Sequence, residues 1–378
     1  MKNKILVIFG TRPEAIKMAP VIRALQSDNT FETKVCVTGQ HREMLDQVLQ
    51  IFNIKPDYDL DIMQKNQDLS DITSGVIIGL RKILNEYKPN RVLVHGDTTT
   101  TLAASLASYY AQIPVCHVEA GLRTGNIYSP WPEEMNRKLT SSITDIHFAP
   151  TKWAKQNLVN EGIKVEQVEI TGNTVIDALL WVSEKIESDS SLEKSLEEKF
   201  PFIAQNKDNK ERIILVTGHR RENIGKPLED ICHILLEIVA QEDVRIIYPV
   251  HLNPNVQKTV YDILGNHPRI HLIEPQSYLP FVYLMNKAHI IITDSGGIQE
   301  EAPALGKPVL VTRETTERPE AVEAGTVKLV GSNANNIINE TKRLLNDHGY
   351  YLKISFMHNP YGDGDASEKI LKRLKHAI

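Results

Sequence analysis

Cysteine is scarce in this sequence, with three residues among 378. Cys36, Cys116 and Cys232 are far apart and lie in apolar patterns typical of strands or helices. This spacing gives no disulfide framework, so we predict reduced core residues of a cytoplasmic protein and assign them no chemistry.

Long apolar runs are also missing. No stretch approaches the roughly 20 apolar residues that a membrane helix needs. The first apolar run, residues 5–9, stops at Gly10 and is too short for the apolar region of a secretory signal peptide. We therefore expect neither a membrane span nor a cleaved leader.

An excess of positive charge is absent too, since the formal net charge is -5. This balance argues against a nucleic-acid partner and against binding to an anionic membrane surface. If the substrate is an anion, a few local cations must hold it.

The sequence does contain short apolar runs that alternate with amphipathic stretches. Near-continuous Ile, Val and Leu runs indicate strands buried on both faces, hence parallel sheets covered by helices. The length suits two domains, so we predict an α/β protein with two Rossmann-like, doubly wound domains and a cleft between them. The predicted strands of the first half are Ile5–Phe9, Thr33–Thr38, Arg91–His95, Pro114–Val118 and Asp145–Ala149. Those of the second half are Val168–Thr171, Arg212–Thr217, Arg245–Pro249, Ile270–Ile273, His289–Thr293, Val309–Thr312 and Thr326–Leu329.

The domain boundary is expected near Gly172. This places the first domain at residues 1–171 and the second at residues 172–360. A final helix, roughly Ala366–Lys375, follows a turn rich in Pro and Gly. We expect residues 361–378 to pack back on the first domain.

Polar residues follow the first predicted strand, at the strand end where open parallel sheets bind ligands. Gly10 permits a tight turn, Pro13 suits the first helical position, and the new helix offers N–H groups to an anion. Arg12 and Lys17 add positive charge about one turn apart. The alternative is a helix start with surface cations. Because both cations flank the turn, we predict an anion site, although the motif is neither Gly-x-Gly-x-x-Gly nor a phosphate loop.

A second turn carries the strongest local signal. Ser295 follows a predicted strand and can cap the next helix, while Gly296 and Gly297 let backbone N–H groups approach a diphosphate closely. Glu301, about one turn later, is placed to accept hydrogen bonds from ribose hydroxyls. The alternative is a plain helix cap, but caps rarely need two successive glycines, so we predict nucleotide binding.

Other strand ends in the second half add to this site. Phe281 can stack on a base while the Gln276 backbone reads its edge, although an isolated Phe is usually a core residue. Arg318 can reach the phosphates or the ribose, or can form a surface ion pair instead. His219 begins a polar loop after another strand and is placed to contact a phosphate or a leaving group; the alternative is a structural histidine.

The first half contributes carboxylates. Asp97 and Glu119 follow two different strands, and Glu133 and Glu134 open a helix. The two helix residues can simply interact with the helix dipole, which is our interpretation of Glu134. Carboxylates near an anionic ligand cost free energy unless they handle protons, so we predict acid–base roles for Asp97 and Glu119.

A metal site is the rival interpretation. His95 with Asp97 and His117 with Glu119 form two His-x-acid pairs, a set that can ligate zinc or manganese. Buried histidines are also common before a strand end, so we predict no metal.

Together these motifs resemble the non-hydrolysing UDP-N-acetylglucosamine 2-epimerases, and the resemblance covers nearly the whole chain. It implies a GT-B-like fold, a homodimer, no cofactor, and interconversion of UDP-GlcNAc and UDP-ManNAc for surface polysaccharide synthesis. The segments that carry it are residues 9–17, 95–97, 118–123, 132–134, 217–222 and 294–297.

The resemblance also implies roles for individual residues. Asp97, Glu119 and Glu133 are implied to be the catalytic carboxylates, and His219 is implied to act beside the leaving group. We assign Asp97 as the base at carbon 2, with the other two donating or relaying the opposite proton. The residues implied to hold UDP are Arg12, Lys17, His219, Gln276, Phe281, Ser295, Gly296, Gly297, Glu301 and Arg318.

The chemistry of carbon 2 fits such a set. Its hydrogen lies beside no carbonyl group, so direct deprotonation is unfavourable, and a nicotinamide fingerprint for oxidation is absent. Expelling UDP first places positive charge on the anomeric carbon and acidifies that hydrogen. The enzyme then needs cations for the departing diphosphate, a carboxylate base, and an acid on the other face.

Some members of this family carry a second, activating UDP-GlcNAc site, and Gln40 and His41 match part of its motif. An arginine that we associate with this site is not evident in residues 63–67, which argues against activation by substrate. Three alternative functions stay open: a glycosyltransferase of the same architecture, an epimerase that hydrolyses its substrate, and a nucleotide-sugar sensor without catalysis.

Overall fold

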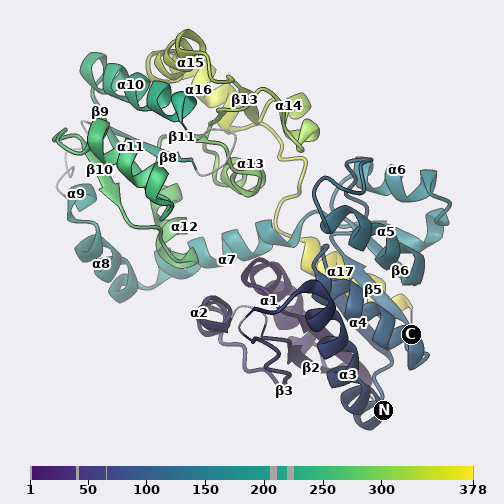
Figure 1. The fold of residues 1–378 in the computed structure, drawn as a ribbon. Helices are drawn as coiled ribbons and strands as arrows, with labels where there is room; N and C mark the ends of the chain where they lie inside the picture. The colour runs from purple at the N-terminus through teal and green to yellow at the C-terminus, as the bar shows by residue number, and fades with distance from the viewer. Residues whose placement is uncertain (1, 40–41, 65, 205–210, 219–224, 378) are drawn as a thin grey trace. The chain divides into compact units, whose positions relative to one another are not determined.

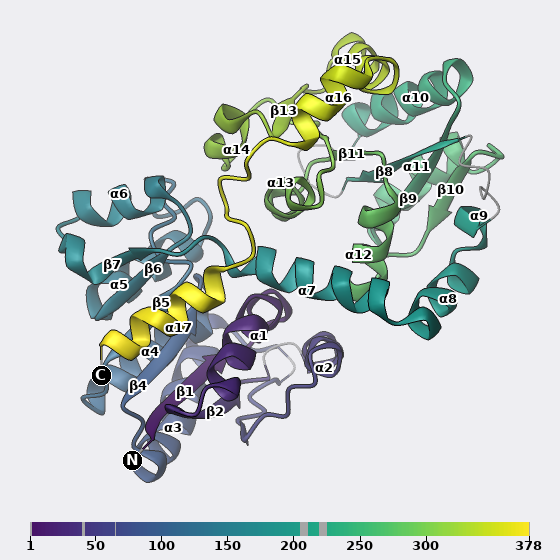
Figure 2. The same cartoon turned by 180° about the vertical axis from the view of Figure 1, so that it is seen from behind.

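The computed structural model describes residues 2–39, 42–64, 66–204, 211–218 and 225–377. The chain forms two compact units, the first made of Met1–Ala178 with Tyr361–Ile378 and the second of Leu179–Pro360. The main segment of the first unit thus ends at residue 178, where the sequence suggested 171. Figures 1 and 2 show the ribbon from opposite sides.

The first unit holds a seven-stranded sheet in the order β3-β2-β1-β4-β5-β6-β7, with all neighbours parallel. The order reverses between β1 and β4, as in a doubly wound sheet. The strands are β1 (Asn3–Phe9), β2 (Phe31–Val37), β3 (Tyr58–Asp59), β4 (Arg91–His95), β5 (Val115–Val118), β6 (Ile146–Ala149) and β7 (Val168–Ile170). The helices are α1 (Arg12–Ser27), α2 (Arg42–Ile51), α3 (Leu69–Tyr87), α4 (Thr99–Tyr110), α5 (Glu133–Ile143), α6 (Lys152–Asn160), η1 (Val165–Gln167) and α17 (Ala366–His376), with α7 (Thr174–Ser188) leading into the second unit.

The second unit repeats this plan with six parallel strands in the order β10-β9-β8-β11-β12-β13. Its order reverses between β8 and β11. The strands are β8 (Arg212–Thr217), β9 (Val244–Pro249), β10 (Ile270–Ile273), β11 (Ile290–Thr293), β12 (Val309–Val311) and β13 (Val327–Leu329). The helices are α8 (Ser190–Lys199), α9 (Pro201–Ala204), α10 (Lys226–Gln241), α11 (Pro254–Leu264), α12 (Tyr278–Lys287), α13 (Gly296–Glu301), η3 (Ala302–Leu305), α14 (Pro319–Ala324), α15 (Ala334–Asn346) and α16 (His348–Ser355).

The predicted fold class, two Rossmann-like doubly wound halves, is confirmed by these two sheets. The strand Val168–Thr171 was grouped with the strands of the second half, whereas β7 pairs with β6 in the first sheet, within the residues predicted for the first domain. The short strand β3 at the edge of that sheet was not predicted, since two residues carry too little periodicity. None of the helices that the structure describes combines the length and apolar character needed to cross a membrane.

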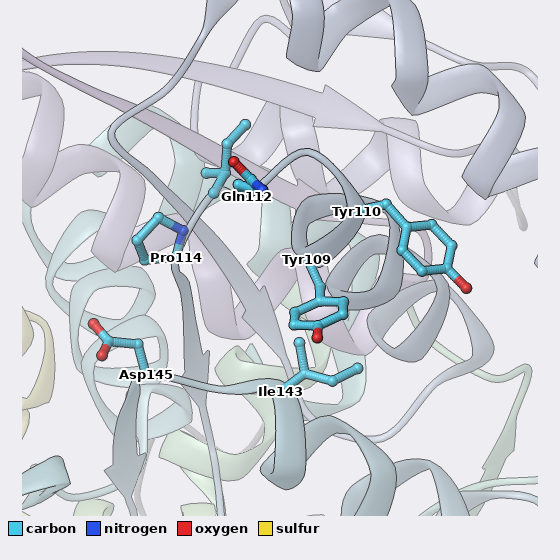
Figure 3. A pocket seen from close by; sticks show the side chains of 7 residues that line it. Tyr109, Tyr110, Gln112, Pro114, Ile143 and Asp145 are labelled. Carbon is cyan, nitrogen blue, oxygen red and sulfur yellow. The ribbon is translucent and has the colours of Figure 1, made fainter.

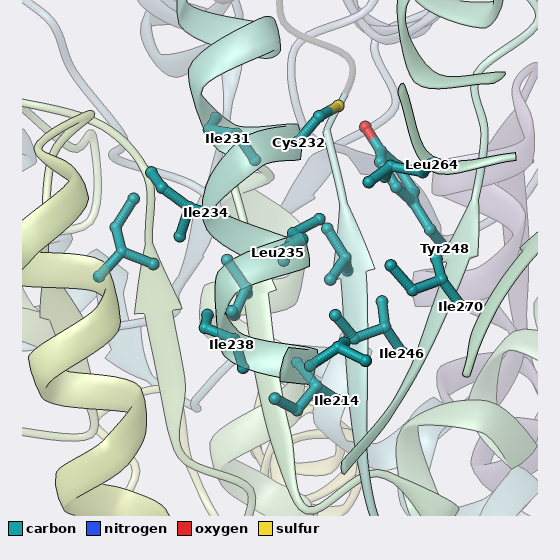
Figure 4. Close-up of a cluster of buried hydrophobic side chains, with 14 of the residues drawn as sticks. Ile214, Ile231, Cys232, Ile234, Leu235, Ile238, Ile246, Tyr248, Leu264 and Ile270 are labelled. Atoms are coloured by element: carbon teal, nitrogen blue, oxygen red, sulfur yellow. The ribbon is translucent and has the colours of Figure 1, made fainter. Parts of the chain in front are cut away.

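Buried aliphatic side chains explain why both faces of each sheet are covered. In the second unit, Ile214 and Ile246 from β8 and β9 pack with Leu235 and Ile238 from α10, all fully buried (Figure 4). Strands with such side chains on both faces have no face left for water, which fits a parallel sheet between helical layers.

The first unit has a surface hollow of about 580 Å³ at the amino ends of β5 and β6 (Figure 3). Ligands of open α/β sheets bind at the carboxyl ends of the strands, so this hollow is at the wrong end for the predicted chemistry. The residues lining it are Tyr109, Tyr110, Gln112, Ile113, Pro114, Ile143 and Asp145.

Close packing, and not a left-handed turn, explains the glycine after β1. A Cβ atom on Gly10 would lie 2.2 Å from Thr38 Oγ1 and 2.6 Å from Thr100 Oγ1. Both threonines are fully buried, and their hydroxyl groups are 3.1 Å apart. Only a residue without a side chain therefore fits where the chain passes from β1 to α1.

Replacing this glycine tests the packing argument. We expect Gly10→Ala to lower the free energy of unfolding by about 1–3 kcal/mol through overpacking, measured by urea unfolding. In a background carrying Thr38→Ala and Thr100→Ala, the same replacement should cost much less, because the clashing hydroxyl groups are gone. An equal cost in both backgrounds would show that the threonines are not the reason for Gly10.

Candidate functional site

The carboxyl ends of β1 and β4 are joined by the buried side chain of Glu14. Its Oε2 accepts hydrogen bonds from the backbone N–H groups of Gly10 and Thr11 at 3.0 and 2.7 Å. Its Oε1 accepts from the hydroxyl groups of Thr98 and Thr101 at 2.8 and 3.1 Å. Burial raises the pKa of Glu14 despite these hydrogen bonds. Two of the N–H groups expected to face an anion are therefore occupied by a carboxylate of the chain itself.

Among the predicted catalytic carboxylates, Glu119 contacts residues from several separate segments of the chain. It follows β5 with a left-handed backbone, at φ 61°, which a residue with a side chain rarely adopts. Its Oε2 accepts from Asn173 Nδ2 at 2.9 Å and forms an ion pair with Lys17 Nζ from α1. The side chain is only 9% exposed. Lys17, predicted to hold the ligand, is thus brought together with a predicted catalytic acid.

Asp97 lies after β4 and is held by a residue that the sequence analysis missed. Arg137 of α5 donates from Nε and Nη2 to Asp97 Oδ2 at 2.9 and 2.6 Å. Asn136 Nδ2 donates to the Asp97 backbone carbonyl at 2.8 Å. The two acids Glu133 and Glu134, with Arg137 one turn later on the same helix, were the available signal in the sequence.

The acidic pair at the start of α5 divides into two roles. Glu134 is fully buried and accepts from the N–H groups of Thr124 and Gly125 and from Arg137 Nη1, at 3.1, 3.0 and 3.1 Å. Burial raises its pKa, but the hydrogen bonds outweigh burial and the net shift is downward. Glu134 thus anchors the preceding loop, a structural role. Glu133 has a buried Oε2 without a hydrogen-bond partner, so this oxygen is available to a ligand.

The histidines of the rival metal site do not converge with the carboxylates as a ligand set. His117 Nε2 lies 2.6 Å from the Gly96 carbonyl, and Asp97 is paired with Arg137. His95 Nε2 lies 3.9 Å from Glu119 Oε2. Across the residues that the structure describes, no three His, Cys, Asp or Glu side chains gather around a common point.

In the second unit, polar residues meet at the carboxyl ends of β8 and β11, where the strand order reverses. The hydroxyl groups of Thr217 and Thr293 are 2.6 Å apart, and Thr293 Oγ1 accepts from the Ser295 N–H at 2.9 Å. Ser295 is the N-cap residue of α13, yet its side chain makes no capping hydrogen bond. Gly296 and Gly297 form the first turn of α13. The amides of this turn are thus presented without a serine cap, as an anion site requires.

Two charged side chains flank these glycines. A Cβ atom on Gly296 would lie 3.6 Å from Arg318 Cζ, and one on Gly297 would lie 3.5 Å from Glu301 Oε1. Arg318 forms an ion pair with the buried Glu300, which fixes the guanidinium beside the turn. Glu301 Oε2 accepts from the Tyr278 hydroxyl at 3.3 Å. The predicted cluster of Gly296, Gly297, Glu301 and Arg318 is therefore brought together around the start of α13.

The remaining predicted residues are distributed as follows. Gln276 lies between β10 and α12, and its Nε2 donates to the Glu274 carbonyl at 2.6 Å. Phe281 is half-buried on α12 and Arg12 is half-buried at the start of α1. Three residues with predicted roles, His219, Gln40 and His41, lie outside the described part of the chain.

Comparisons with known proteins agree on one family. Residues 23–375 match the family model described as UDP-N-acetylglucosamine 2-epimerase. The UDP-N-acetylglucosamine 2-epimerase of Escherichia coli (strain K12) is 59% identical over 374 residues, which cover 99% of this chain and 98% of that protein.

Solved structures give the same answer. The Neisseria meningitidis UDP-GlcNAc 2-epimerase bound to UDP-GlcNAc superposes with a TM-score of 0.88 and 57% identity, covering 99% of this chain and 100% of that one. The Methanocaldococcus jannaschii UDP-GlcNAc 2-epimerase in complex with UDP-GlcNAc and UDP gives a TM-score of 0.77 and 35% identity, with 99% of each chain covered.

The buried histidines make a prediction about stability and pH. Burial lowers the pKa of His95 and His117 to about 4 and that of His147 to about 3, whereas a histidine in the unfolded chain titrates near 6.5. The unfolded chain therefore binds protons that the folded chain does not. Stability should fall as the pH decreases from about 6.5 towards 4, by up to about 1.4 kcal/mol per pH unit for each histidine.

Urea unfolding at pH 7, 6 and 5 measures this slope. We expect His147→Asn to reduce the slope of the free energy of unfolding against pH by the contribution of one histidine. His233→Asn, at an exposed position on α10, is the control and should leave this slope unchanged. Equal slopes for the wild type and His147→Asn would contradict the prediction.

Proposed function

This chain belongs to the UDP-N-acetylglucosamine 2-epimerase family, and we propose that carboxylates of its first unit and the α13 turn of its second unit perform the reaction. The activity is the epimerisation of UDP-GlcNAc at carbon 2, giving UDP-ManNAc. The observation that carries this assignment is that both groups of residues lie at the carboxyl ends of the strands: Asp97 and Glu119 follow β4 and β5, and Ser295 follows β11. Ligands of such sheets usually bind at this edge.

The proposed reaction begins with departure of UDP. The bond between carbon 1 and the glycosidic oxygen breaks, and its electron pair leaves with the diphosphate. Asp97 then takes the proton from carbon 2, so that the electrons of that bond form the double bond of a glycal. The reverse reaction on the other face of carbon 2 gives the epimer, with Glu119 or Glu133 supplying the proton.

The diphosphate needs positive partners at the moment it leaves. The amide groups of Gly296 and Gly297 and the guanidinium of Arg318 are assembled before the reaction, because Glu300 holds Arg318 in place. Fixed dipoles and charges of this kind stabilise a developing anion without reorganisation. Glu301 is proposed to bind the ribose hydroxyl groups, and Phe281 with Gln276 the uracil base.

Lys17 is connected both with the binding of UDP and with the catalytic carboxylates. It is a predicted ligand of UDP, and in this structure it is paired with Glu119. We assign it to the acid–base group, because its ammonium contacts the Glu119 carboxylate and fixes the position of this side chain. This assignment is added to the predicted role of Lys17 as a ligand of UDP and rests on the ion pair.

We also propose that the protein is a homodimer in the cytoplasm. The large apolar or aromatic side chains of Ile78, Tyr109 and Tyr110 on α3 and α4 are between 62% and 67% exposed, a pattern that suits a contact between copies. The three cysteines are buried and unpaired, which fits a reducing compartment. Light scattering on the purified protein measures the oligomeric state, and a monomer would contradict the first part.

The role of Asp97 is tested by Asp97→Asn in deuterated water. We expect turnover to fall about 10²–10⁴-fold, because the amide cannot accept the carbon 2 proton. Deuterium incorporation at carbon 2 should fall in parallel when it is followed by proton NMR. Asp145→Asn is the matched control, since Asp145 also pairs with an arginine, Arg91, but at the opposite end of the sheet. Full exchange by Asp97→Asn would refute the assignment.

The UDP site is tested by Gly297→Ala. The new methyl group meets Glu301 Oε1 at an ordinary 3.5 Å, so the protein should fold, but the methyl group keeps a diphosphate from the backbone. We expect the Kd of UDP to rise about 10-fold or more in calorimetry. Gly349→Ala, whose Cβ would also meet a carboxylate oxygen at 3.5 Å, should bind UDP normally. Unchanged binding by Gly297→Ala would place the nucleotide elsewhere.

Incubation without any acceptor separates the alternatives. A glycosyltransferase would leave UDP-GlcNAc unchanged, a hydrolysing epimerase would release UDP and free ManNAc, and a sensor would bind the sugar nucleotide without converting it. We expect UDP-ManNAc to form with no other addition.

A further inference from the structure

The segment that leaves the first unit and the segment that returns to it are in contact with each other within this unit. The chain leaves this unit after Ala178 and re-enters it at Tyr361. The N–H of Asn173 donates to the Tyr361 carbonyl at 2.7 Å. Gly172 and Gly362 both have a positive φ, and a Cβ atom on Gly362 would lie 3.4 Å from the Gly172 Cα. The outgoing and returning segments therefore lie in direct backbone contact.

A second fastening lies a few residues further along both segments. Asp177 Oδ1 accepts from the N–H and the hydroxyl of Ser367 at 2.7 and 2.6 Å, and Oδ2 accepts from the Ala366 N–H at 3.3 Å. These bonds satisfy amides at the start of α17, which otherwise lack partners. The returning segment is thus held to the outgoing one at two successive points.

The side chain of Asn173 connects this contact to the candidate active site. Asn173 is 3% exposed. Its Oδ1 accepts from the Val175 N–H at 3.1 Å, which fixes the orientation of the amide, because only the oxygen can accept from an N–H. Its Nδ2 must then face Glu119, and it donates to Oε2 at 2.9 Å. One residue therefore bonds to the returning segment through its backbone and to Glu119 through its side chain.

Glu119 needs a residue that fixes the position of its side chain, for two reasons. Its left-handed backbone is a strained conformation that persists only when neighbours determine it. Its carboxylate is also largely buried, which favours the protonated form unless donors compensate. The groups that face it are Lys17 from α1, His95 from β4 and Asn173, with His117 of β5 further away.

We propose that Asn173 is a positioning residue for the reaction, which orients the Glu119 carboxylate and makes its placement depend on the contact with Tyr361. This inference rests on the proposed acid–base role of Glu119. Asn173 donates one hydrogen bond to the Glu119 oxygen that also receives the Lys17 ammonium, so two donors from different elements fix the position of this oxygen.

The isosteric variant Asn173→Asp tests the positioning role. Its carboxylate still accepts from Val175 and its backbone still donates to Tyr361, but a negative charge replaces the donor to Glu119. Two adjacent carboxylates share a proton, so the limb of the pH profile of kcat/KM that Glu119 sets should move up by about one unit or more. We expect kcat to fall about 10- to 100-fold and KM to change less than about threefold. An unchanged pH profile and kcat would overturn the proposal.

A stability cycle keeps the test informative if Asn173→Asp folds poorly. In the exchange Asn173→Asp with Glu119→Gln, the amide and the carboxylate trade places, and the hydrogen bond can form in reverse. We expect the double variant to recover most of the melting temperature that Asn173→Asp loses at pH 8. Additive losses would show that the two side chains do not depend on each other.

The link to the returning segment is tested by Gly362→Ala, which strains the positive-φ backbone where it lies against Gly172 and does not touch Glu119. We expect this variant to shift the same pH limb and to lower kcat in the same direction as Asn173→Asp. Gly162→Ala is the matched control, because this glycine also has a positive φ but has nothing within 4 Å of its Cβ position. It should lose stability and keep the wild-type pH profile; identical profiles for both glycine variants would contradict the link.

The outcome separates this inference from the proposed function. If the wild-type protein does not convert UDP-GlcNAc, the proposed function fails. If the wild type is active and its pH profile is indifferent to Asn173→Asp and Gly362→Ala, the function stands and the positioning role is wrong.

Discussion

The ion pair between Lys17 and Glu119 is the interaction on which the proposed chemistry of the first unit depends. A buried carboxylate at the end of a strand would otherwise take up a proton or turn away from the site. The ammonium from α1 and the amide of Asn173 hold it in place, in a backbone conformation that is unfavourable by itself. The cost of burying the pair is accepted because the reaction needs a carboxylate at a fixed position, not because such a pair adds much stability.

The same principle explains how the first unit keeps several acids close together without mutual repulsion. Each is compensated by donors: Glu14 has four hydrogen-bond donors, Glu134 has two backbone amides, and Asp97 and Glu134 share Arg137. Glu133 differs, because its buried Oε2 has no hydrogen-bond partner. The second unit differs, since amides at the start of α13 lie beside the guanidinium of Arg318, the groups proposed to hold an anion. This contrast matches a reaction in which protons and a leaving diphosphate are handled by different groups.

Much of this fold is predictable because the strands are buried on both faces. β4, β8 and β10 have the predicted limits, since polar or turn residues bound their apolar runs. Ser295 and the two glycines after it are also predictable, because two glycines at a helix start have few structural explanations. The edge strand β3 is not, as pairing with β2 and not its own pattern makes it a strand.

Partners between distant elements are what the sequence could not supply. From the sequence alone, Arg137 is interpreted as a surface cation. In the structure it forms an ion pair with Asp97. The sequence predicts Lys17 as a phosphate ligand but does not predict its pairing with Glu119, because nothing in the sequence places α1 beside the end of β5. Gly10 reads as a turn residue, whereas the two threonines that exclude a side chain are 28 and 90 positions away.

The central claim is that the bond between the sugar and UDP breaks during each conversion, so that fixed acids can act on carbon 2. UDP-GlcNAc with ¹⁸O in the bridging position between carbon 1 and the phosphate tests this directly by phosphorus NMR. The account predicts that the label spreads to the non-bridging oxygens of the same phosphate as epimerisation proceeds, because the freed phosphate can rotate before it returns. Epimerisation with the label still confined to the bridge would contradict it.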